Sequence, residues 1–448
     1  MPSVLYWFRQ DLRLADLPAL QAALAAGEPV LPVYIHDPAM APGAASRWWL
    51  HHSLEALDHA LRRLGSRLIL RTGNWAEQIA ELMRETGAAQ VFATRMHEPA
   101  ARKAEREVRG LRLLGGGSLF NPDLIKSQTG SIYGVYTPFA RAVLARPAPP
   151  APLPAPAEIP SPEVWPRSDE LSDWRLLPRA PDWAAGWQEL WQPGEAGATR
   201  ALSGFRAGAI DRYDSDRDRP DLAGTSRLSP HLHFGEISAA TVWHATETAE
   251  KFRAEILWRE FALYLLWHRP ELAERCLRPE FENFPWRDDP NGLRAWQQGR
   301  TGVPIVDAGM RELWQTGFMH NRVRMIVASF LTKHLLLPWQ LGAAWFLDTL
   351  VDADLAANST GWQWAAGCGV EAQPFFRIFN PVTQGEKFDP DGIYVRRYVP
   401  ELRGIAGKAI HAPWTLEPLL RNAVDYPPPL VDLAAGRARA LAAFGSIR

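Results

Sequence analysis

The chain has 448 residues, of which 47% are hydrophobic and 22% are charged, and its formal net charge is −1. This length predicts about two to three domains with room for a large core, and the near-zero charge gives no global sign of nucleic-acid binding. No apolar run reaches the roughly 18 residues of a membrane span, and two cysteines, Cys276 and Cys368, are too few for a disulfide framework or a four-cysteine metal site.

The first third of the chain alternates short apolar runs with amphipathic stretches. Runs rich in β-branched or aromatic residues cover 3–8, 29–36, 66–73 and 88–95, and an amphipathic stretch covers 46–65. Strands separated by helices predict a parallel, Rossmann-like sheet, so we expect an α/β domain over residues 1–130. The N-terminus lacks the apolar core of a signal peptide, and we expect a cytoplasmic protein.

The loop at 8–16, "FRQDLRLAD", follows the first expected strand. Ligands of parallel sheets bind beyond the carboxyl ends of the strands, so this loop is a candidate ligand loop. It lacks the GxGxxG pattern, which argues against a dinucleotide site there.

An interdomain linker is expected over 131–195. Its segment 147–166 carries nine prolines, a composition typical of an extended, semi-rigid connection. From 196 to 448 the apolar periodicity is helical, with breaks at Pro and Gly. We therefore expect an α/β domain followed by an all-α domain.

A cluster of small hydroxyl side chains occurs at 224–230, "GTSRLSP". Hydroxyls and backbone N–H groups at a helix start can bind an anion. The simpler alternative is an N-cap cluster, and the segment alone favours that alternative.

Two helical segments each place mixed chemistry on one face. Glu255, Trp258 and Arg259 are spaced i, i+3, i+4, as are Asn321, Arg324 and Met325. An acid, an indole and a guanidinium together suit a nucleobase-like ligand. The alternatives are an exposed ion pair over a half-buried Trp and an ordinary basic helix turn.

The segment 352–364, "DADLAANSTGWQW", is apolar around two acids and an amide. Buried carboxylates require partners, and a buried Arg324 could pair with Asp352 or Asp354.

The motifs "GTSRLSP", "WREF", "MHNRVRMIVASFL", "DADLAAN…GWQW" and "FFRIFNPVTQGEKFDPDG" together resemble the DNA photolyase/cryptochrome family. The resemblance covers almost the whole chain and is strongest to bacterial class I cyclobutane pyrimidine dimer photolyases. It implies an N-terminal α/β domain, a linker, and a helical domain that holds a U-shaped FAD.

The resemblance also implies roles for single residues around the flavin. Arg324 would pair with Asp352, and Asn358 would face N5 and favour the reduced flavin. The implied FAD-binding residues are Tyr213, Thr225, Ser226, Arg227, Leu228, Ser229, Phe252, Arg324, Asp352, Ala353, Asp354 and Asn358.

The implied substrate is a pyrimidine dimer flipped out of duplex DNA. Trp258 and Trp364 would stack on its rings, Glu255 would hydrogen-bond it, and Arg322 and Arg377 would bind flanking phosphates. The implied substrate and DNA residues are Glu255, Trp258, Arg259, Asn321, Arg322, Met325, Trp364 and Arg377.

Three further tryptophans resemble a photoreduction chain, with Trp362 nearest the flavin, then Trp339, then Trp286. The alternative for each is aromatic burial in the core. Separate tasks for Trp362 and Trp364 favour a helix here, because helical residues two apart point in nearly opposite directions.

Family members carry a second, antenna chromophore in the α/β domain, which is a folate, a deazaflavin or a flavin. Residues 93–105 follow the family pattern, but Ala100 and Ala101 stand where folate binders commonly have Asn and Glu. The identity of this chromophore stays open.

The resemblance predicts a monomeric deoxyribodipyrimidine photo-lyase that repairs DNA with blue light and reduced FAD. The alternative is a cryptochrome, which binds FAD as a photoreceptor without repair; Asn358 and Met325 argue against it. A nicotinamide-dependent flavin oxidoreductase is disfavoured by the missing GxGxxG pattern.

Overall fold

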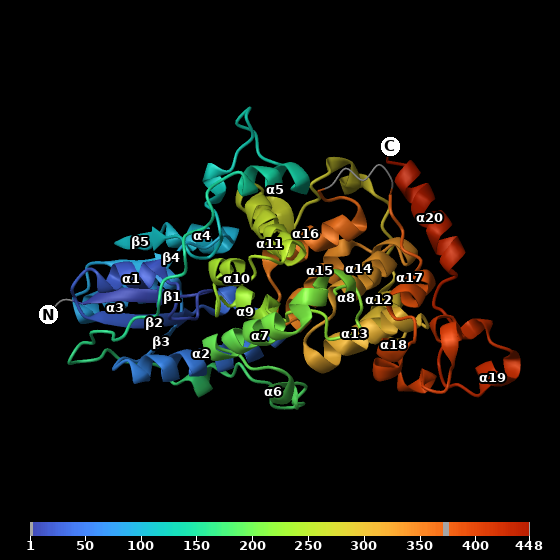
Figure 1. The fold of residues 1–448 in the computed structure, drawn as a ribbon, viewed down its shortest axis with the longest axis horizontal. Helices are drawn as coiled ribbons and strands as arrows, with labels where there is room; N and C mark the ends of the chain where they lie inside the picture. Colours follow the sequence, from blue (N-terminus) through green and yellow to red (C-terminus); the bar gives the residue numbers. More distant parts are fainter. Residues whose placement is uncertain (1–2, 371–375, 448) are drawn as a thin grey trace. The chain divides into compact units, whose positions relative to one another are not determined.

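The computed structural model describes residues 3–370 and 376–447. The chain divides into two compact units, and Figure 1 labels most of their helices and strands. Unit 1 consists of Met1–Gly208, Ser226–Pro270 and Val351–Ala356, and unit 2 of Ala209–Thr225, Glu271–Leu350 and Ala357–Arg448. The domain limits expected from the sequence, near residues 130 and 195, stay predictions.

Unit 1 is built on a five-stranded parallel sheet with the strand order β3-β2-β1-β4-β5. Four strands coincide with the expected apolar runs, which confirms the predicted parallel α/β sheet. The sequence pattern misses the fifth, whose residues are largely half-buried. The strands are β1 (Val4–Phe8), β2 (Val30–His36), β3 (Ile69–Thr72), β4 (Val91–Thr94) and β5 (Leu111–Leu114).

The helices of unit 1 come from both of its long segments. They are α1 (Pro18–Leu24), α2 (Ala44–Arg63), α3 (Trp75–Thr86), α4 (Pro99–Glu105), α5 (Tyr136–Leu144), α6 (Trp187–Leu190), α7 (Glu195–Ala207), α9 (Ser229–His233), α10 (Ala239–Ala245) and α11 (Glu250–His268).

Both faces of the sheet are covered. Leu5 and Trp7 of β1 and Val33 of β2 belong to one core cluster with α3, whereas α1 packs on β1 and β4. Side chains alternate across a strand, so every residue of β1 is buried. This explains why the strands are continuous apolar runs rather than alternating ones.

The proline-rich segment 147–166 is extended, as expected, and lies along unit 1. Its carbonyls accept backbone hydrogen bonds: Leu153 from Asp16 (2.7 Å) and Pro160 from Val30 (2.7 Å). Proline has no N–H to donate, but its carbonyl still accepts, so the segment is fixed to the sheet domain.

Unit 2 is helical among its described residues, which confirms the expected all-α region. It contains α8 (Tyr213–Asp216), α12 (Pro290–Gln297), α13 (Pro304–Thr316), α14 (Asn321–Ser329), a π-helical turn (Phe330–His334), α15 (Trp339–Thr349), α16 (Leu355–Ala366, apart from its first two residues), α17 (Pro381–Phe388), α18 (Ile393–Tyr398), α19 (Pro418–Asn422) and α20 (Leu433–Gly445).

Candidate cofactor and substrate site

Helix α11 of unit 1 carries the predicted acid, indole and guanidinium. The indole of Trp258 stacks face to face on the ring of Tyr136 in α5, with ring centroids 3.8 Å apart and planes 5° from parallel. The Tyr136 hydroxyl donates to the carbonyl of Ala254 at 3.0 Å, which ties α5 to α11. Trp258 is half-buried, and Tyr136 covers one face of its ring.

Tyr136 is a site residue that the sequence reasoning missed. Burial, with a further contribution from the Glu255 carboxylate, raises the pKa of Tyr136 to about 12. The phenol is therefore neutral and remains a hydrogen-bond donor. Its sequence signal is its place in the segment 120–142, "FNPDLIKSQTGSIYGVYTPFARA", which also resembles the photolyase/cryptochrome family.

The guanidinium of Arg259 is engaged inside unit 1. It pairs with the Glu260 carboxylate at 2.9 Å and donates to the carbonyl of Gly117 at 3.2 Å. Burial raises the pKa of Glu260 to about 7, although the neighbouring Arg259 acts to lower it. These contacts give Arg259 a structural task, and its predicted contact with DNA stays a prediction.

A small cavity lies in unit 1 where β1 and β4 end. The strand order reverses between these two strands, which is where ligands of open parallel sheets bind. The cavity holds about 30 Å³, room for about one water molecule. Its lining includes His97, Glu98, His233, Arg259 and Asp354.

The titratable groups of this cavity influence one another. Burial lowers the pKa of His97 to about 4, with Arg259 adding to the effect and Asp354 opposing it. Burial raises the pKa of Glu98 despite the hydrogen bond from Gln10. The buried Nδ1 of His233 has no protein partner among the described residues, and a water in the cavity would supply one.

The loop at 8–16 makes many of its polar contacts within unit 1. Its residues Gln10, Asp11 and Arg13 also line this cavity, and its role as a ligand loop stays a prediction. Arg9 forms an ion pair with Glu105 at 2.6 Å, and Asp11 accepts from the Tyr6 hydroxyl at 2.7 Å. Arg13 donates to the carbonyl of Gly235 at 2.9 Å. Both arginines that follow β1 therefore bond to groups within unit 1.

The hydroxyl cluster forms a tight turn at the start of α9. The Ser226 hydroxyl accepts from the backbone N–H of Leu228 at 3.3 Å. Arg227 has a positive φ of 53°, and its guanidinium lies 4.1 Å from the centroid of the Trp191 ring. Ser229 is the first residue of α9. Of the other residues expected near the flavin, Phe252 is buried in unit 1 and Tyr213 is buried in unit 2.

Helix α14 of unit 2 begins at the predicted basic segment, with His320 as its N-cap. Arg322 pairs with Asp218 at 2.7 Å, and Arg324 donates through Nε to the carbonyl of Met319 at 2.7 Å. Asn321 is exposed and Met325 half-buried. The helix confirms that Asn321, Arg324 and Met325 share a face, whereas Arg322 already has a protein partner.

Helix α16 contains the amide and both tryptophans of the segment 352–364, so the expected helical geometry is confirmed. Asn358 donates through Nδ2 to the carbonyl of Ala343 in α15 at 3.0 Å. This bond fixes the amide plane and directs its oxygen away from that carbonyl. Asp352, Ala353 and Asp354 precede the helix and belong to unit 1.

Trp362 is buried against α15 with 2% of its surface exposed. A methyl group on Gly342 would lie 2.1 Å from its ring, so only glycine permits this approach. Phe346 contacts the ring edge-on, with centroids 5.0 Å apart. The buried Nε1 of Trp362 has no partner among the described residues.

The other two tryptophans of the predicted chain also belong to unit 2. Trp339 is fully buried at the start of α15, and its Nε1 donates to the sulfur of Cys276 at 3.4 Å. Trp286 is half-buried and lies against Phe284, with ring centroids 4.4 Å apart.

Trp364 and Arg377, which were predicted to contact DNA, line one small cavity in unit 2. This cavity holds about 40 Å³ and is also lined by Arg278 and Phe379. The centroids of the Trp364 and Phe379 rings are 6.3 Å apart. The structure therefore brings an indole and two guanidinium groups together, a combination that suits stacked bases and phosphates.

The polar atoms around α16 fit a flat heteroaromatic cofactor. Trp362 Nε1 and Thr360 Oγ1 are buried without a partner among the described residues, and Asn358 offers an oriented amide. Asn358 and Trp362 are four residues apart and share a face of α16, so their polar atoms are the ones that could meet a single flat ligand, whereas Thr360 lies on another face.

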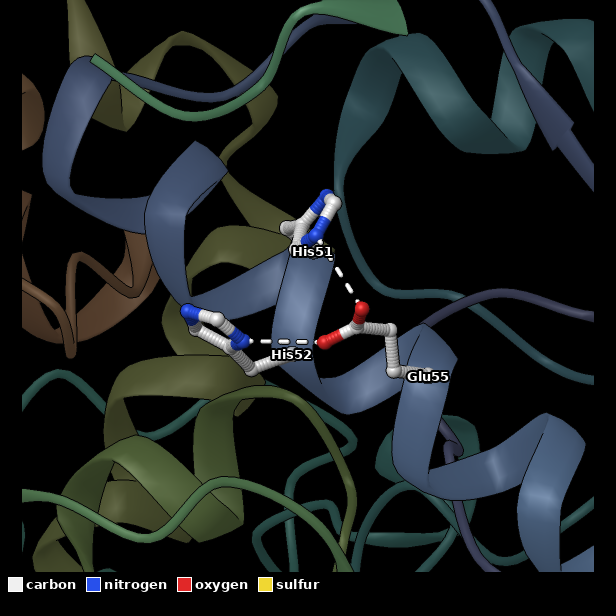
Figure 2. Close-up of side chains that lie close together, drawn as sticks. All are labelled: His51, His52 and Glu55. Carbon is white, nitrogen blue, oxygen red and sulfur yellow. Dashed lines mark hydrogen bonds and ion pairs between the residues drawn. The ribbon is translucent and has the colours of Figure 1, made fainter. Parts of the chain in front are cut away.

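A second cluster lies on α2 of unit 1. Figure 2 shows the carboxylate of Glu55 between His51 (Nε2–Oε1, 3.4 Å) and His52 (Nδ1–Oε2, 3.1 Å). Their ligand atoms lie within 4.8 Å of one another, a spacing that a metal ion could bridge. Each imidazole already has the carboxylate as a partner, so these contacts need no ion.

A cavity of about 630 Å³ runs beside this cluster. Its volume falls in the range of small-molecule sites. Its lining is mixed in charge. The basic side chains are His51, His59, Arg62, Arg67, Arg175 and Arg179, and the acidic ones are Glu55, Asp58, Asp169 and Glu170.

Across residues 3–370 and 376–447, none of the helices combines the length and the apolar character that a membrane span requires.

Two family models match the chain. One is described as DNA photolyase and matches residues 4–157, and the other is described as the FAD binding domain of DNA photolyase and matches residues 252–446. The deoxyribodipyrimidine photo-lyase of Agrobacterium fabrum is 48% identical over 99% of this chain and 98% of its own length. Cryptochrome-1 of Arabidopsis thaliana is 37% identical over 97% of this chain and 69% of its own length.

A solved structure shows the same likeness in three dimensions. The bacterial class III photolyase from Agrobacterium tumefaciens is 48% identical, has a TM-score of 0.96, and is matched over 100% of this chain and 98% of its own. The expected assignment to class I is therefore not confirmed. The expected fold, enzyme class and FAD cofactor are confirmed, and the chain belongs to the DNA photolyase/cryptochrome family.

Proposed function

We propose that the chain is a light-driven lyase that splits cyclobutane pyrimidine dimers in DNA. FAD, when bound and reduced, supplies an electron to the dimer under blue light and receives it back after the ring has opened. The observation that carries the proposal is the Trp258–Tyr136 stack beside Glu255, because it joins an aromatic platform and an acid on one helix.

Trp258 is the residue proposed to hold the flipped dimer. Tyr136 covers one face of its ring at 3.8 Å, and a pyrimidine ring would stack on the other face. The Tyr136 hydroxyl is bonded to the α11 backbone, so the platform is fixed before the dimer arrives. Preorganisation of this kind lowers the entropy cost of binding.

Glu255 lies three residues before Trp258 on α11, within reach of the same ligand. We propose that its carboxyl group hydrogen-bonds the carbonyl and N3–H edge of the dimer. Negative charge develops on that edge after electron transfer, so this contact would stabilise the dimer anion.

Asn358 is proposed to face N5 of the flavin. Its Nδ2 is engaged by the carbonyl of Ala343, so its oxygen is the atom presented as an acceptor. An acceptor at this place favours the reduced flavin, which carries a hydrogen at N5. Arg324, oriented by the carbonyl of Met319, is proposed to pair with Asp352 beside the ring, and Asp354 to meet the ring or ribose side.

Three tryptophans are proposed to resupply electrons in the order Trp286, Trp339, Trp362. Helix α15 links the two buried tryptophans. Trp339 is its first residue, and Gly342, about one turn later, lies against the Trp362 ring. The half-buried Trp286 would be the member that meets a donor in solution.

A cryptochrome without repair activity is the second candidate, and the 37% identity to Cryptochrome-1 favours it. Asn358 favours repair, since plant-type cryptochromes typically carry Asp at that position. Met325 favours the cyclobutane dimer as the substrate, since (6-4) photolyases carry His there. Within the photolyases, we propose class III in place of class I, on the likeness to the Agrobacterium structure.

We propose that a second chromophore binds in the 630 Å³ cavity beside α2. The lining holds four arginines and four carboxylates, and Arg62 pairs with Asp58 at 2.6 Å; its arginines are the groups that would hold an anionic part of the chromophore. Replacing Arg62 and Arg67 by Ala should remove its absorbance from the purified protein and leave the FAD absorbance unchanged. Equal loss of both absorbances would contradict this placement.

The decisive experiment is a repair assay on an oligonucleotide with one cyclobutane dimer. Chemically reduced holoenzyme and blue light should restore the undamaged oligonucleotide, and the same sample in the dark should not. Glu255→Ala should lower repair per bound FAD without lowering FAD content. Unchanged dimer after illumination of reduced enzyme would overturn the proposal and favour the photoreceptor.

A further inference from the structure

The two cysteines of the chain meet in unit 2. The segment around Cys276 is held to the end of α16 by two backbone donors: Leu277 donates to Gln363 Oε1 (2.9 Å) and Arg278 donates to the carbonyl of Cys368 (3.0 Å). Each thiol influences the pKa of the other: Cys368 lowers the pKa of Cys276, and Cys276 adds to the burial that raises the pKa of Cys368. Cys368 is fully buried and Cys276 is half-buried.

The sulfur of Cys276 also touches the proposed electron route, because it accepts the indole N–H of the buried Trp339 at 3.4 Å. From this contact we propose that Cys276 and Cys368 form a dithiol that supplies electrons through Trp339 for photoreduction of FAD. The inference rests on the proposed function, since it needs light-driven oxidation of the tryptophan chain.

Cys276 is the cysteine that would be oxidised first. Interaction with the Cys368 thiol and the hydrogen bond from Trp339 Nε1 lower the pKa of Cys276, whereas burial raises the pKa of Cys368. Cys276 is thus the more easily deprotonated thiol of the two, and it is the one in contact with Trp339.

The step balances in electrons and protons. The half-buried Cys276 gives one electron to oxidised Trp339 and its proton to solvent, and becomes a thiyl radical. Cys368 then loses its proton and forms an S–S bond with this radical, and the resulting disulfide radical anion gives a second electron to Trp339. The two thiols thus release two electrons and two protons. Conversion of oxidised FAD to FADH⁻ takes up two electrons and one proton, and the remaining proton is the one lost to solvent from Cys276.

Lys333 is the group proposed to receive the proton from Cys368. It is fully buried, its Nζ lies 3.2 Å from the centroid of the Phe376 ring, and it donates to the carbonyl of Ala366. Burial holds its pKa well below the usual value, and it interacts electrostatically with Cys368. A buried lysine with a lowered pKa can act as a proton acceptor.

The test follows thiols and flavin together. Holoenzyme with oxidised FAD is illuminated with blue light under anaerobic conditions without an added reductant. Flavin reduction is read from absorbance, and free thiols are titrated after denaturation. Because the chain has two cysteines, the expected loss is both thiols per FAD reduced, with a Cys276–Cys368 crosslinked peptide in the mass spectrum. Unchanged thiols after flavin reduction would overturn the inference.

Variants localise the effect. Cys276→Ser keeps an acceptor for Trp339 Nε1 but removes the oxidisable sulfur, so flavin reduction without added reductant should be lost, as it should in Cys368→Ser. Trp362→Phe should lose flavin reduction and retain both thiols. Normal flavin reduction in Cys276→Ser would contradict the inference.

A repair assay with dithionite-reduced enzyme separates this inference from the proposed function. Reduced wild type and reduced Cys276→Ser should repair equally. If reduced wild type fails to repair, the proposed function is wrong whatever the thiols do. If it repairs while illumination leaves the thiols intact, only the dithiol inference is wrong.

Discussion

Trp258 of unit 1 and Trp362 of unit 2 have opposite surroundings. Trp258 is half-buried and stacks face to face on one aromatic ring. Trp362 is buried, is contacted edge-on by Phe346, and lies against a glycine. The difference shows how one residue type serves two tasks: an indole with an open face can bind a ligand, whereas an enclosed indole can only pack or carry an electron.

The largest expected effect comes from a substitution that crowds the buried ring of Trp362. Gly342→Ala places a methyl group 2.1 Å from the ring, and overpacking of this kind should lower the free energy of unfolding by about 3 kcal/mol. Urea denaturation, read as a shift in midpoint at constant slope, measures this change.

Gly361→Ala on α16 is the matched control for this substitution. Nothing lies within 4 Å of an added Cβ there, so alanine should stabilise the helix by about 0.5–1 kcal/mol. If both alanine variants behave alike, the close approach of Gly342 and Trp362 does not limit packing.

The pH dependence of the free energy of unfolding tests a second buried side chain of unit 2, His320, which is the N-cap of α14. Its ring accepts from the N–H of Arg322 at 3.2 Å, and burial lowers its pKa to about 4. The folded state therefore resists protonation that the unfolded chain accepts near pH 6.5. The stability contribution is complete above pH 6.5 and is lost as the pH falls toward 4, by about 2 kcal/mol at pH 5.

His320→Asn isolates this titration, because asparagine also caps helices but does not ionise. The free energy of unfolding is measured at pH 7.5 and pH 5 for both proteins. The drop between the two pH values should be smaller in the variant by about 2 kcal/mol. An identical drop in both proteins would show that His320 does not contribute to acid sensitivity.

The smallest expected effect comes from substitutions of Tyr136, whose ring stacks on Trp258. Tyr136→Ala removes the stacked ring and should weaken binding of a dimer-containing oligonucleotide by about 1 kcal/mol, which is about fivefold in Kd. Tyr136→Phe keeps the stack and loses only the hydrogen bond to Ala254, so it should weaken binding less. Equal weakening in both variants would assign the effect to the hydroxyl group.

Local patterns predicted much of the fold. The four apolar runs became β1 to β4, and the i, i+3, i+4 spacings placed Glu255 with Trp258 and Arg324 with Met325 on helices. The edge strand β5 was missed because its four residues are mostly half-buried and give little apolar contrast.

Charged residues were harder to interpret from the sequence than apolar ones. Arg259 and Arg322 were both assigned to DNA, yet one pairs with Glu260 and the other with Asp218. The sequence around an arginine does not distinguish a guanidinium that binds a phosphate from one that pairs with a distant carboxylate. Only the folded chain shows which partner is within reach.

The sequence by itself determined the parallel sheet, the helical unit and the family, because apolar periodicity and family motifs lie within short stretches of the chain. The tertiary structure alone decided the contacts of Tyr136 with Trp258, Gly342 with Trp362, and Cys276 with Trp339. Tyr136 and the α11 carbonyl it binds are 118 residues apart, and Cys276 and Trp339 are 63 apart. Contacts of this kind depend on how packed helices bring distant segments together, which no local pattern encodes.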